Sequence, residues 1–245
     1  MKSTGNTILI TGGTAGIGRE LAVEFQRAGN KVIIAGRNRA ALAEIVAANP
    51  GMAAMELDIS GNGIPDFAKR VVADHPVLNI LVNNAGIMRF EDKIDLAAAE
   101  ATVATNLLGP IRLTSALLPH LQTRPDATII NVSSTQAFVP LPFSPTYCAT
   151  KAALHAWTFG LRMQLRGSGV EVIEIIPPAV QTELTPGQSQ SPFAMPLASF
   201  IAQTMALLRQ EPTPAEICVA EALPWRSVVD DARVAAELRK FGLSA

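Results

Sequence analysis

Tyr147, Lys151 and Ser134 are the residues whose types and spacing suit acid–base chemistry. Tyr147 and Lys151 lie at positions i and i+4 of an expected helix over 146–166, so they share one helix face. The Lys151 ammonium can therefore lie near the phenol and stabilise its phenolate form. Ser134 ends an expected strand and offers a hydroxyl that can donate a hydrogen bond to a developing oxyanion. A Tyr and Lys at this spacing are also common by chance, so their context decides the interpretation.

A glycine-rich turn between Thr11 and Gly18 follows the first expected strand. Gly12 lets the chain turn sharply, Gly16 leaves room for a pyrophosphate, and Gly18 allows a helix to pack on the sheet. The free N–H groups and the positive end of the helix dipole would face the anion. Many strand-to-helix turns contain glycine, but this position favours a dinucleotide site.

Arg37 follows the second expected strand, where an NAD-binding unit usually places an acid for the ribose hydroxyls. No acid stands there. Arg37, helped by Arg39, offers a guanidinium that can bind a 2′-phosphate. The sequence therefore predicts NADP as the cofactor, with NAD less favoured. The alternative is that the two arginines merely open an exposed helix.

Short apolar runs alternate with segments of helical periodicity, which is the pattern of βαβ units around a parallel sheet. Several runs are apolar on both faces, as expected where helices cover both sides. We therefore expect a Rossmann-like, doubly wound α/β fold with three α/β/α layers, and one domain over residues 1–245. The expected strands are 7–11, 31–35, 53–57, 80–83, 127–133 and 171–176, and the expected helices are 16–28, 39–48, 64–74, 96–121 and 146–166.

Four separated motifs resemble those of the short-chain dehydrogenase/reductase family in its single-domain form. They are the Thr-Gly-x-x-x-Gly-x-Gly turn at 11–18, Asn-Asn-Ala-Gly at 83–86, Ser134 with Tyr147 and Lys151, and Asn106 in the long helix. Their joint order is highly specific, and the resemblance covers roughly residues 7–182. It implies an oxidoreductase that interconverts a carbonyl and a primary or secondary alcohol by hydride transfer.

The resemblance also implies roles for single residues. Asn106, Ser134, Tyr147 and Lys151 would form the catalytic tetrad, with Asn106 holding a water that links Lys151 to solvent. A free tyrosine has a pKa of about 10, and lowering it to about 7 requires about 4 kcal/mol, which Lys151 and the oxidised nicotinamide could supply. The implied cofactor contacts are Gly12, Thr14, Gly16, Ile17, Gly18, Arg37, Asp58, Ile59, Asn84, Ala85, Gly86, Tyr147, Lys151, Pro177, Val180 and Thr182.

Composition excludes several function classes. The chain has 20 Lys and Arg against 21 Asp and Glu, which gives no electrostatic reason to bind nucleic acid or anionic lipid. Cys148 and Cys218 lack any spacing that closes a metal site, and the three histidines are interpreted as structural. No signal peptide or membrane span is apparent, so a cytoplasmic location is expected.

The region after residue 176 departs from the family pattern. Pro177 is followed by Pro178 where the family has Pro-Gly, and the Gly-rich C-terminal strand is missing. Both features are similar to a branch of bacterial oxidoreductases encoded near D-alanyl-teichoic-acid genes. Residues 183–209 are expected to form a substrate lid, and 225–245 an exposed terminal helix. The expected apolar pocket residues, which favour uncharged carbonyl substrates, are Met88, Phe138, Phe143, Leu184, Phe193, Met195, Leu197, Phe200 and Met205. The alternative is that these residues simply cover the hydrophobic core.

Two other functions remain as alternatives. A cofactor-sensing binding protein could keep the fold without the chemistry, although the presence of all four tetrad residues argues against it. A sugar-nucleotide epimerase is disfavoured by the glycine spacing and by the lack of a sizeable C-terminal substrate domain. The resemblance further implies a homodimer through the helices 96–121 and 146–166, and leaves a tetramer open.

Overall fold

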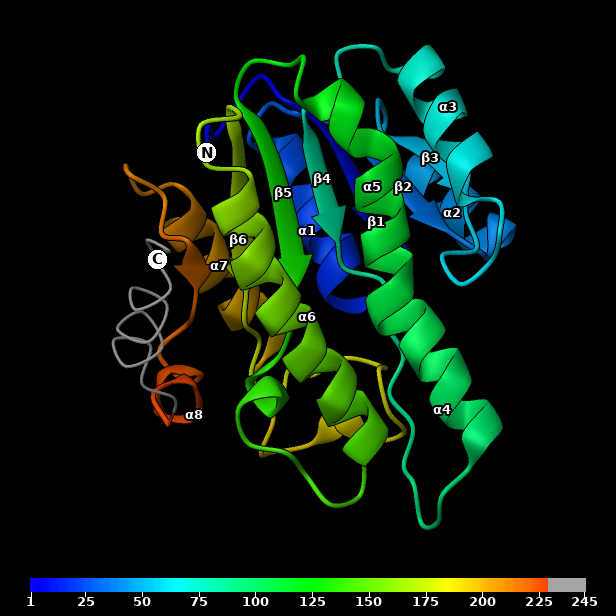
Figure 1. The fold of residues 1–245 in the computed structure, drawn as a ribbon, viewed down its shortest axis with the longest axis vertical. Coiled ribbons are helices and arrows are strands. Elements are labelled where there is room, and N and C mark those ends of the chain that lie inside the picture. Colours follow the sequence, from blue (N-terminus) through cyan, green and yellow to red (C-terminus); the bar gives the residue numbers. More distant parts are fainter. Residues whose placement is uncertain (229–245) are drawn as a thin grey trace.

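The computed structural model describes residues 1–228, and its centre is one parallel sheet of seven strands (Figure 1). The strand order is β3-β2-β1-β4-β5-β6-β7, so the chain fills one side of β1 before it crosses to the other. The strands are β1 (Thr7–Thr11), β2 (Lys31–Gly36), β3 (Ala53–Glu56), β4 (Ile80–Asn83), β5 (Ala127–Val132), β6 (Val170–Ile175) and β7 (Glu216–Ile217). This is the Rossmann-like fold that the alternating pattern predicts.

The order of the strands creates a switch point between β1 and β4. Ile8 pairs with Val32 of β2 on one side and with Ile80 of β4 on the other. The chain leaves these two central strands in opposite directions along the sheet, which opens a crevice beyond their carboxyl ends. Both strands are completely buried, because helices cover both faces.

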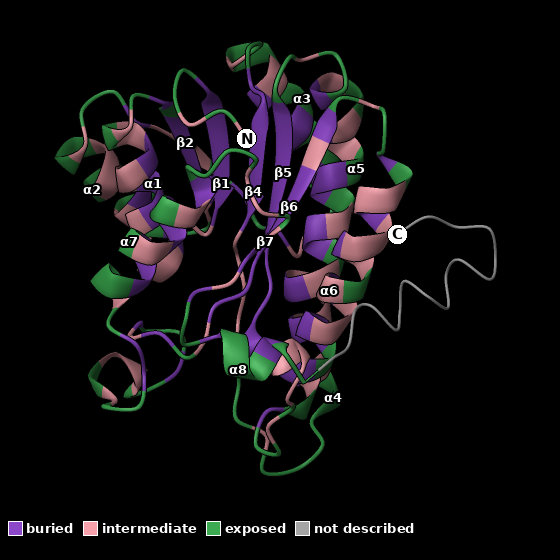
Figure 2. Cartoon of the chain, turned by 90° about the vertical axis from the view of Figure 1, so that its left-hand side faces the viewer, coloured by how far each residue is buried: buried purple, intermediate pink, exposed green. Residues whose placement is uncertain are grey.

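Helices cover the sheet on both sides (Figure 2). One layer contains α1 (Gly16–Arg27), α2 (Arg39–Ala48) and α7 (Leu197–Leu208), which pack on the side chains of Ile8 and Ile10. The other layer contains α3 (Ile64–Asp74), α5 (Gly109–Leu121) and α6 (Pro145–Gln164), which pack on Leu9 and its neighbours. Alternate residues of each strand thus supply two cores.

Local sequence explains where several helices begin. The Asn38 side chain accepts a hydrogen bond from the Ala41 N–H and caps α2, while Asp95 does the same for α4 (Leu96–Val103) through Ala98. Pro65 stands in the first turn of α3, where its missing N–H costs nothing. The short 3-10 segments η2 (Thr135–Ala137) and η3 (Gln188–Gln190) and the helix α8 (Leu223–Arg226) complete the described chain.

Two expectations need correction, and a third is largely untested. The six expected strands miss a seventh, because β7 extends the sheet; it has only two residues, no glycine, and no apolar alternation to reveal it. The expected helix 96–121 is interrupted by a π-helical segment, η1 (Ala104–Leu108), between α4 and α5. The expected terminal helix 225–245 lies largely outside the described residues, which contain only its first positions, at the end of α8.

Candidate active site

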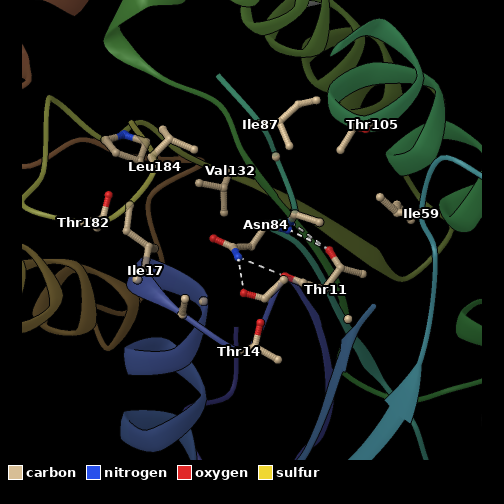
Figure 3. A pocket seen from close by; sticks show the side chains of 18 of the residues that line it. Thr11, Thr14, Ile17, Ile59, Asn84, Ile87, Thr105, Val132, Thr182 and Leu184 are labelled. Carbon is tan, nitrogen blue, oxygen red and sulfur yellow. Dashed lines mark hydrogen bonds between the residues drawn. The ribbon is translucent and has the colours of Figure 1, made fainter. Parts of the chain in front are cut away.

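The switch point between β1 and β4 forms a pocket of about 320 Å³ (Figure 3). It is lined by the glycine turn, by the segments after β2, β3, β4 and β5, and by the start of α6. Every residue expected to contact the cofactor lines this one pocket, from Gly12 to Thr182. These residues come from segments far apart in the sequence, including the one after β6, and the structure brings them together in one crevice.

The glycine turn approaches the segment after β4 so closely that side chains have no room. Gly12 has a φ of +67°, and a Cβ on Gly18 would lie 2.3 Å from the Gly12 carbonyl oxygen and from Asn84 Nδ2. Asn84 Nδ2 donates hydrogen bonds to the carbonyls of Thr11 and Gly12, at 2.9 and 3.2 Å. The Thr11 hydroxyl accepts from the N–H groups of Asn84 and Ala85, as Figure 3 shows in part. These bonds hold two loops together as one rigid cradle.

Arg37 and Asp58 border the end of the pocket beside β2 and β3. Hydrogen bonds from Ser60, with a smaller contribution from the Arg37 charge, hold the pKa of Asp58 below its usual value. Arg39 takes no part in the pocket lining, since its guanidinium pairs with Glu56. Of the two arginines, only Arg37 lines the pocket, while Arg39 is engaged by a carboxylate at the end of the neighbouring strand.

Ser134, Tyr147 and Lys151 all line the pocket and are all buried. Lys151 Nζ donates to the Val132 carbonyl at 2.8 Å and lies 5.6 Å from the centre of the Tyr147 ring. Burial raises the pKa of Tyr147 to about 12, although a hydrogen bond with Ser134 lowers it in part. Burial also lowers the pKa of Lys151 to about 8. Desolvation thus opposes both charged forms, and the acidic phenol expected from the sequence is not produced by these contacts alone.

Asn106 differs from the other three expected catalytic residues because it does not line the pocket. It lies in η1 and is completely buried. Its amide oxygen accepts from the Ile87 N–H and its amide nitrogen donates to the Ile87 carbonyl, each at 2.8 Å. A Cβ on Gly86 would lie 3.4 Å from Asn106 Oδ1 and 3.7 Å from Lys151 Nζ. Asn106 thus fixes the loop after β4 beside Lys151.

A second pocket of about 400 Å³ shares Pro178 with the first. The expected lid divides between three places: Leu184 borders the first pocket, Phe193 and Met195 border the second, and α7 carries Phe200 and Met205 into the core. The lid therefore cannot include all of 183–209, because α7 covers the sheet. The remaining expected apolar residues line neither pocket; they are Met88, Phe138, Phe143 and Leu197.

Other pocket residues were not anticipated from the sequence. Some are adjacent in sequence to recognised motifs, and this adjacency could have been used to predict them. Others, such as Thr105 in η1, come near the crevice only through the π-helical segment. The residues in question are Ala15, Ala35, Gly36, Leu57, Ile87, Thr105, Val132, Ser133, Glu183 and Gln188.

Comparison with known proteins identifies the family. The sequence pattern of the short chain dehydrogenase family matches residues 6–192, which is most of the chain. The chain belongs to the short-chain dehydrogenase/reductase family. It is 43% identical over 189 residues to the uncharacterized oxidoreductase DltE of Bacillus subtilis, covering 75% of each chain. It is also 33% identical to dehydrogenase/reductase SDR family member 7B of Bos taurus, of which it spans 59%.

Solved structures of family members have the same fold. A short chain dehydrogenase from Burkholderia cenocepacia in complex with NADP superposes with a TM-score of 0.81 and 26% identity, over 97% of this chain and 99% of the other. A short-chain dehydrogenase from Streptomyces avermitilis gives a TM-score of 0.80 at 27% identity, over 97% and 96% of the chains. None of the helices within residues 1–228 is long and apolar enough to cross a membrane.

Proposed function

We propose that the protein is an NADP(H)-dependent oxidoreductase that interconverts a carbonyl and an alcohol, with Tyr147 as general acid and base. The observation that carries this proposal is that Ser134, Tyr147 and Lys151 line the same pocket as the glycine turn. Bound NADP(H) would supply or accept the hydride. The residues present fit such a group, because a Cβ on Gly12 or Gly18 would collide with the Asn84 loop or the Gly12 carbonyl, and without it the two loops can meet and form the cradle that a pyrophosphate needs.

The side chains of this protein would handle the proton. The Tyr147 phenol is protonated at neutral pH, so it is ready to donate to an alkoxide. Ser134 hydrogen-bonds with Tyr147 and can also bind the substrate oxygen as its charge develops. Lys151 holds a positive charge beside the phenol and stabilises the phenolate that remains. Asn106, fixed to the Ile87 backbone, is proposed to hold a water that returns the proton to Lys151.

NADP rather than NAD is the proposed cofactor. Arg37 is exposed at the pocket edge, whereas Arg39 is paired with Glu56. A guanidinium at this place can bind a 2′-phosphate through two parallel hydrogen bonds. The relative from Burkholderia cenocepacia was solved with NADP, which supports this choice.

The proposed substrate is an uncharged carbonyl compound or the corresponding alcohol. The second pocket begins beside Ser134, at Thr135 and Gln136, and its walls are mostly apolar. Glu221 is the only ionisable side chain of the described residues that lines it, and no cationic one does. An anionic substrate would therefore find no counter-charge there.

An oxidation screen tests the proposal. Purified protein is mixed with NADPH or NADH and a panel of neutral, anionic and cationic aldehydes and ketones, and cofactor oxidation is followed by absorbance. Turnover of neutral carbonyls with NADPH is the expected result, and turnover of anionic substrates alone would reject the proposed substrate class. Tight NADPH binding without any turnover would instead favour the cofactor-sensing alternative.

The proposal also includes a homodimer through the helices 96–121, which are α4, η1 and α5, and 146–166, which is largely α6, with a tetramer left open. It further includes a cytoplasmic location. Sedimentation or light scattering of the purified protein would test the oligomeric state.

A further inference from the structure

Lys151 is a buried lysine whose charge needs a counterpart. Its side chain is only 4% exposed, and it forms no ion pair with any residue of the described chain. The Nζ hydrogen bond to the Val132 carbonyl provides a dipole but no negative charge. A buried ammonium without a counter-charge tends to release its proton, because the low-dielectric interior disfavours the charged form. The proposed reaction needs Lys151 charged.

Glu174 is a carboxylate on the same interface between sheet and helix. It lies in β6, is fully buried, and pairs in register with Asn131 of β5. In-register residues of neighbouring strands point to the same face, and Asn131 donates a hydrogen bond to Thr158 of α6. Glu174 therefore points towards α6. The next residue along β5 is Val132, whose carbonyl accepts from Lys151.

His155 fixes the orientation of this carboxylate. His155 follows Lys151 by one helical turn on the face of α6 that also carries Tyr147. Its Nδ1 lies 2.9 and 3.1 Å from the two oxygens of Glu174. Phe138 packs edge-on against the His155 ring, with centroids 4.7 Å apart. Tyr147, Lys151 and His155 thus form a row, and Glu174 lies against its end.

The other ionisable groups around Glu174 are balanced or uncharged. Glu216 of β7 accepts hydrogen bonds from Arg226 of α8 at 2.7 and 3.1 Å, so these two charges offset each other. Burial raises the pKa of Cys218 to about 11 and that of Tyr147 to about 12, so both are neutral near pH 7. Within residues 1–228, His155 is the only side chain that hydrogen-bonds to the Glu174 carboxylate.

The same cluster does not suggest a metal site. Ligand atoms of His155, Glu174 and Glu216 lie within 4.8 Å of one another. However, Arg226 already contacts both oxygens of Glu216, and a guanidinium repels a metal cation. The cluster is therefore better described as a buried charge network.

We propose that Glu174, oriented by His155, is a positioning residue that acts as the buried counter-charge of Lys151. It touches neither substrate nor cofactor and acts through Lys151. Burial lowers the pKa of Lys151, and the Glu174 charge is what raises it back in part, to about 8. The link to catalysis depends on the proposed function, whereas the electrostatic relation between Glu174 and Lys151 does not.

Competitive acylation of lysines tests the proposal without any need for turnover. Only a neutral amine reacts with acetic anhydride, so the extent of labelling at each pH, measured by peptide mass spectrometry, gives the titration midpoint of each lysine. Lys151 lines the pocket but is nearly buried, so its labelling is slow; the midpoint comes from how its labelling changes with pH, relative to the exposed Lys31 and Lys69 as internal standards. For Glu174→Gln we expect the Lys151 midpoint to fall by about one pH unit.

The conservative variant Glu174→Asp keeps the charge and should leave the Lys151 midpoint near that of the unmodified protein. Thermal melting shows that each variant is folded. If Glu174→Gln does not fold, Glu174→Met carries the same expectation, because it also removes the charge at similar volume. An unchanged Lys151 midpoint in a folded variant without the charge overturns the proposal.

The pH dependence of turnover provides the second readout. In Glu174→Gln, the alkaline limb of the kcat profile should move to lower pH along with the Lys151 midpoint, and Glu174→Asp should restore it. A shifted midpoint in a protein without turnover would support the counter-charge and reject the proposed reaction. Turnover in a Glu174→Gln variant whose Lys151 midpoint is unshifted would support the proposed reaction and reject Glu174 as the counter-charge.

Discussion

The two sides of the crevice are built in different ways. On the side of β1 and β4, backbone atoms meet directly, as where Gly18 packs against the Gly12 carbonyl and Asn84. On the side of β6 and β7, charged and aromatic side chains make the contacts, as where Arg226 binds Glu216 and lies 4.7 Å from the centre of the Phe138 ring. We therefore expect substitutions to cost more on the first side, where Gly12 and Gly18 have no room for a Cβ, than on the second, where several side chains share the contacts.

Tyr147→Phe should have the largest effect on turnover, because Tyr147 lies where the two sides meet. Loss of a general acid typically costs between about 10² and 10⁴ in rate. We expect kcat to fall by about 10³ while the dissociation constant for NADPH stays within about twofold, since the phenylalanine ring still fills the site. Steady-state kinetics and NADPH fluorescence would measure both quantities.

The neighbouring Cys148→Ala is the control, because Cys148 packs against Leu141 and Ser144 rather than in the pocket. Its turnover should remain near normal. Tyr147 is also the only tyrosine of the chain. Phenolate absorbance of the ligand-free protein should therefore rise as one step around its raised pKa of about 12 and be absent from Tyr147→Phe. Near-normal turnover of Tyr147→Phe would remove the proposed donor.

Gly18→Ala should have the next largest effect, on cofactor binding. A Cβ at this position would lie 2.3 Å from two atoms of the cradle, so the turn and the Asn84 loop would have to separate. We expect NADPH affinity to fall by about 100-fold or more, which corresponds to about 3 kcal/mol. Isothermal titration calorimetry would measure it.

Gly63→Ala is a matched control for this change. Gly63 has a φ of −78°, and a Cβ there would meet nothing within 4 Å. Its affinity for NADPH should match that of the unmodified protein. An equal loss of NADPH affinity in Gly18→Ala and Gly63→Ala would mean that NADPH binding does not depend on the close approach of the glycine turn to the Asn84 loop.

This contrast also explains which features could be predicted from the sequence. β1, β4, α2 and α3 begin and end at the predicted residues, because their apolar periods and flanking residues are local signals. The glycine turn was recognisable because two backbone segments that approach each other closely need glycine, which has no Cβ, at the point of contact. The sequence therefore predicts the first side of the crevice in detail.

The second side depends on contacts that no local pattern encodes. Glu174 and Glu216 come together only because β7 pairs with β6, and β7 is too short to show a periodicity. Two further features also depend on residues distant in the sequence. Asn106 of the π-helical segment bonds to the Ile87 backbone, and Arg39 pairs with Glu56. One signal was nevertheless present, since Glu174 is an acid within an apolar strand and buried acids need partners.

Arg37→Ser tests the cofactor choice at the open end of the first side. Loss of a charged hydrogen bond to a phosphate costs about 1.5–3 kcal/mol, so NADPH affinity should fall by about 10-fold to 100-fold while NADH affinity hardly changes. Arg39→Ser is the control and should leave the ratio of the two affinities unchanged, because Glu56 already binds that guanidinium. A loss shared equally by NADPH and NADH would mean that Arg37 does not recognise the 2′-phosphate.

Arg226→Met should have the smallest effect, and it probes the second side. The variant removes the two hydrogen bonds to Glu216 and the contact with Phe138, which follows the short 3-10 segment after Ser134. Because Glu216 then lacks this partner, we expect a loss of about 1–3 kcal/mol in the free energy of unfolding, measured by urea denaturation.

NADPH affinity of Arg226→Met should not change, and kcat should fall only a few fold as the segment that carries Ser134 loosens. Arg70→Met, on the exposed face of α3, serves as the control and should leave both stability and kcat near normal. A large loss of NADPH affinity in Arg226→Met would contradict the division into two sides. The contacts of Arg226 would then have to support the cofactor cradle directly, although Arg226, Glu216 and Phe138 do not line that pocket.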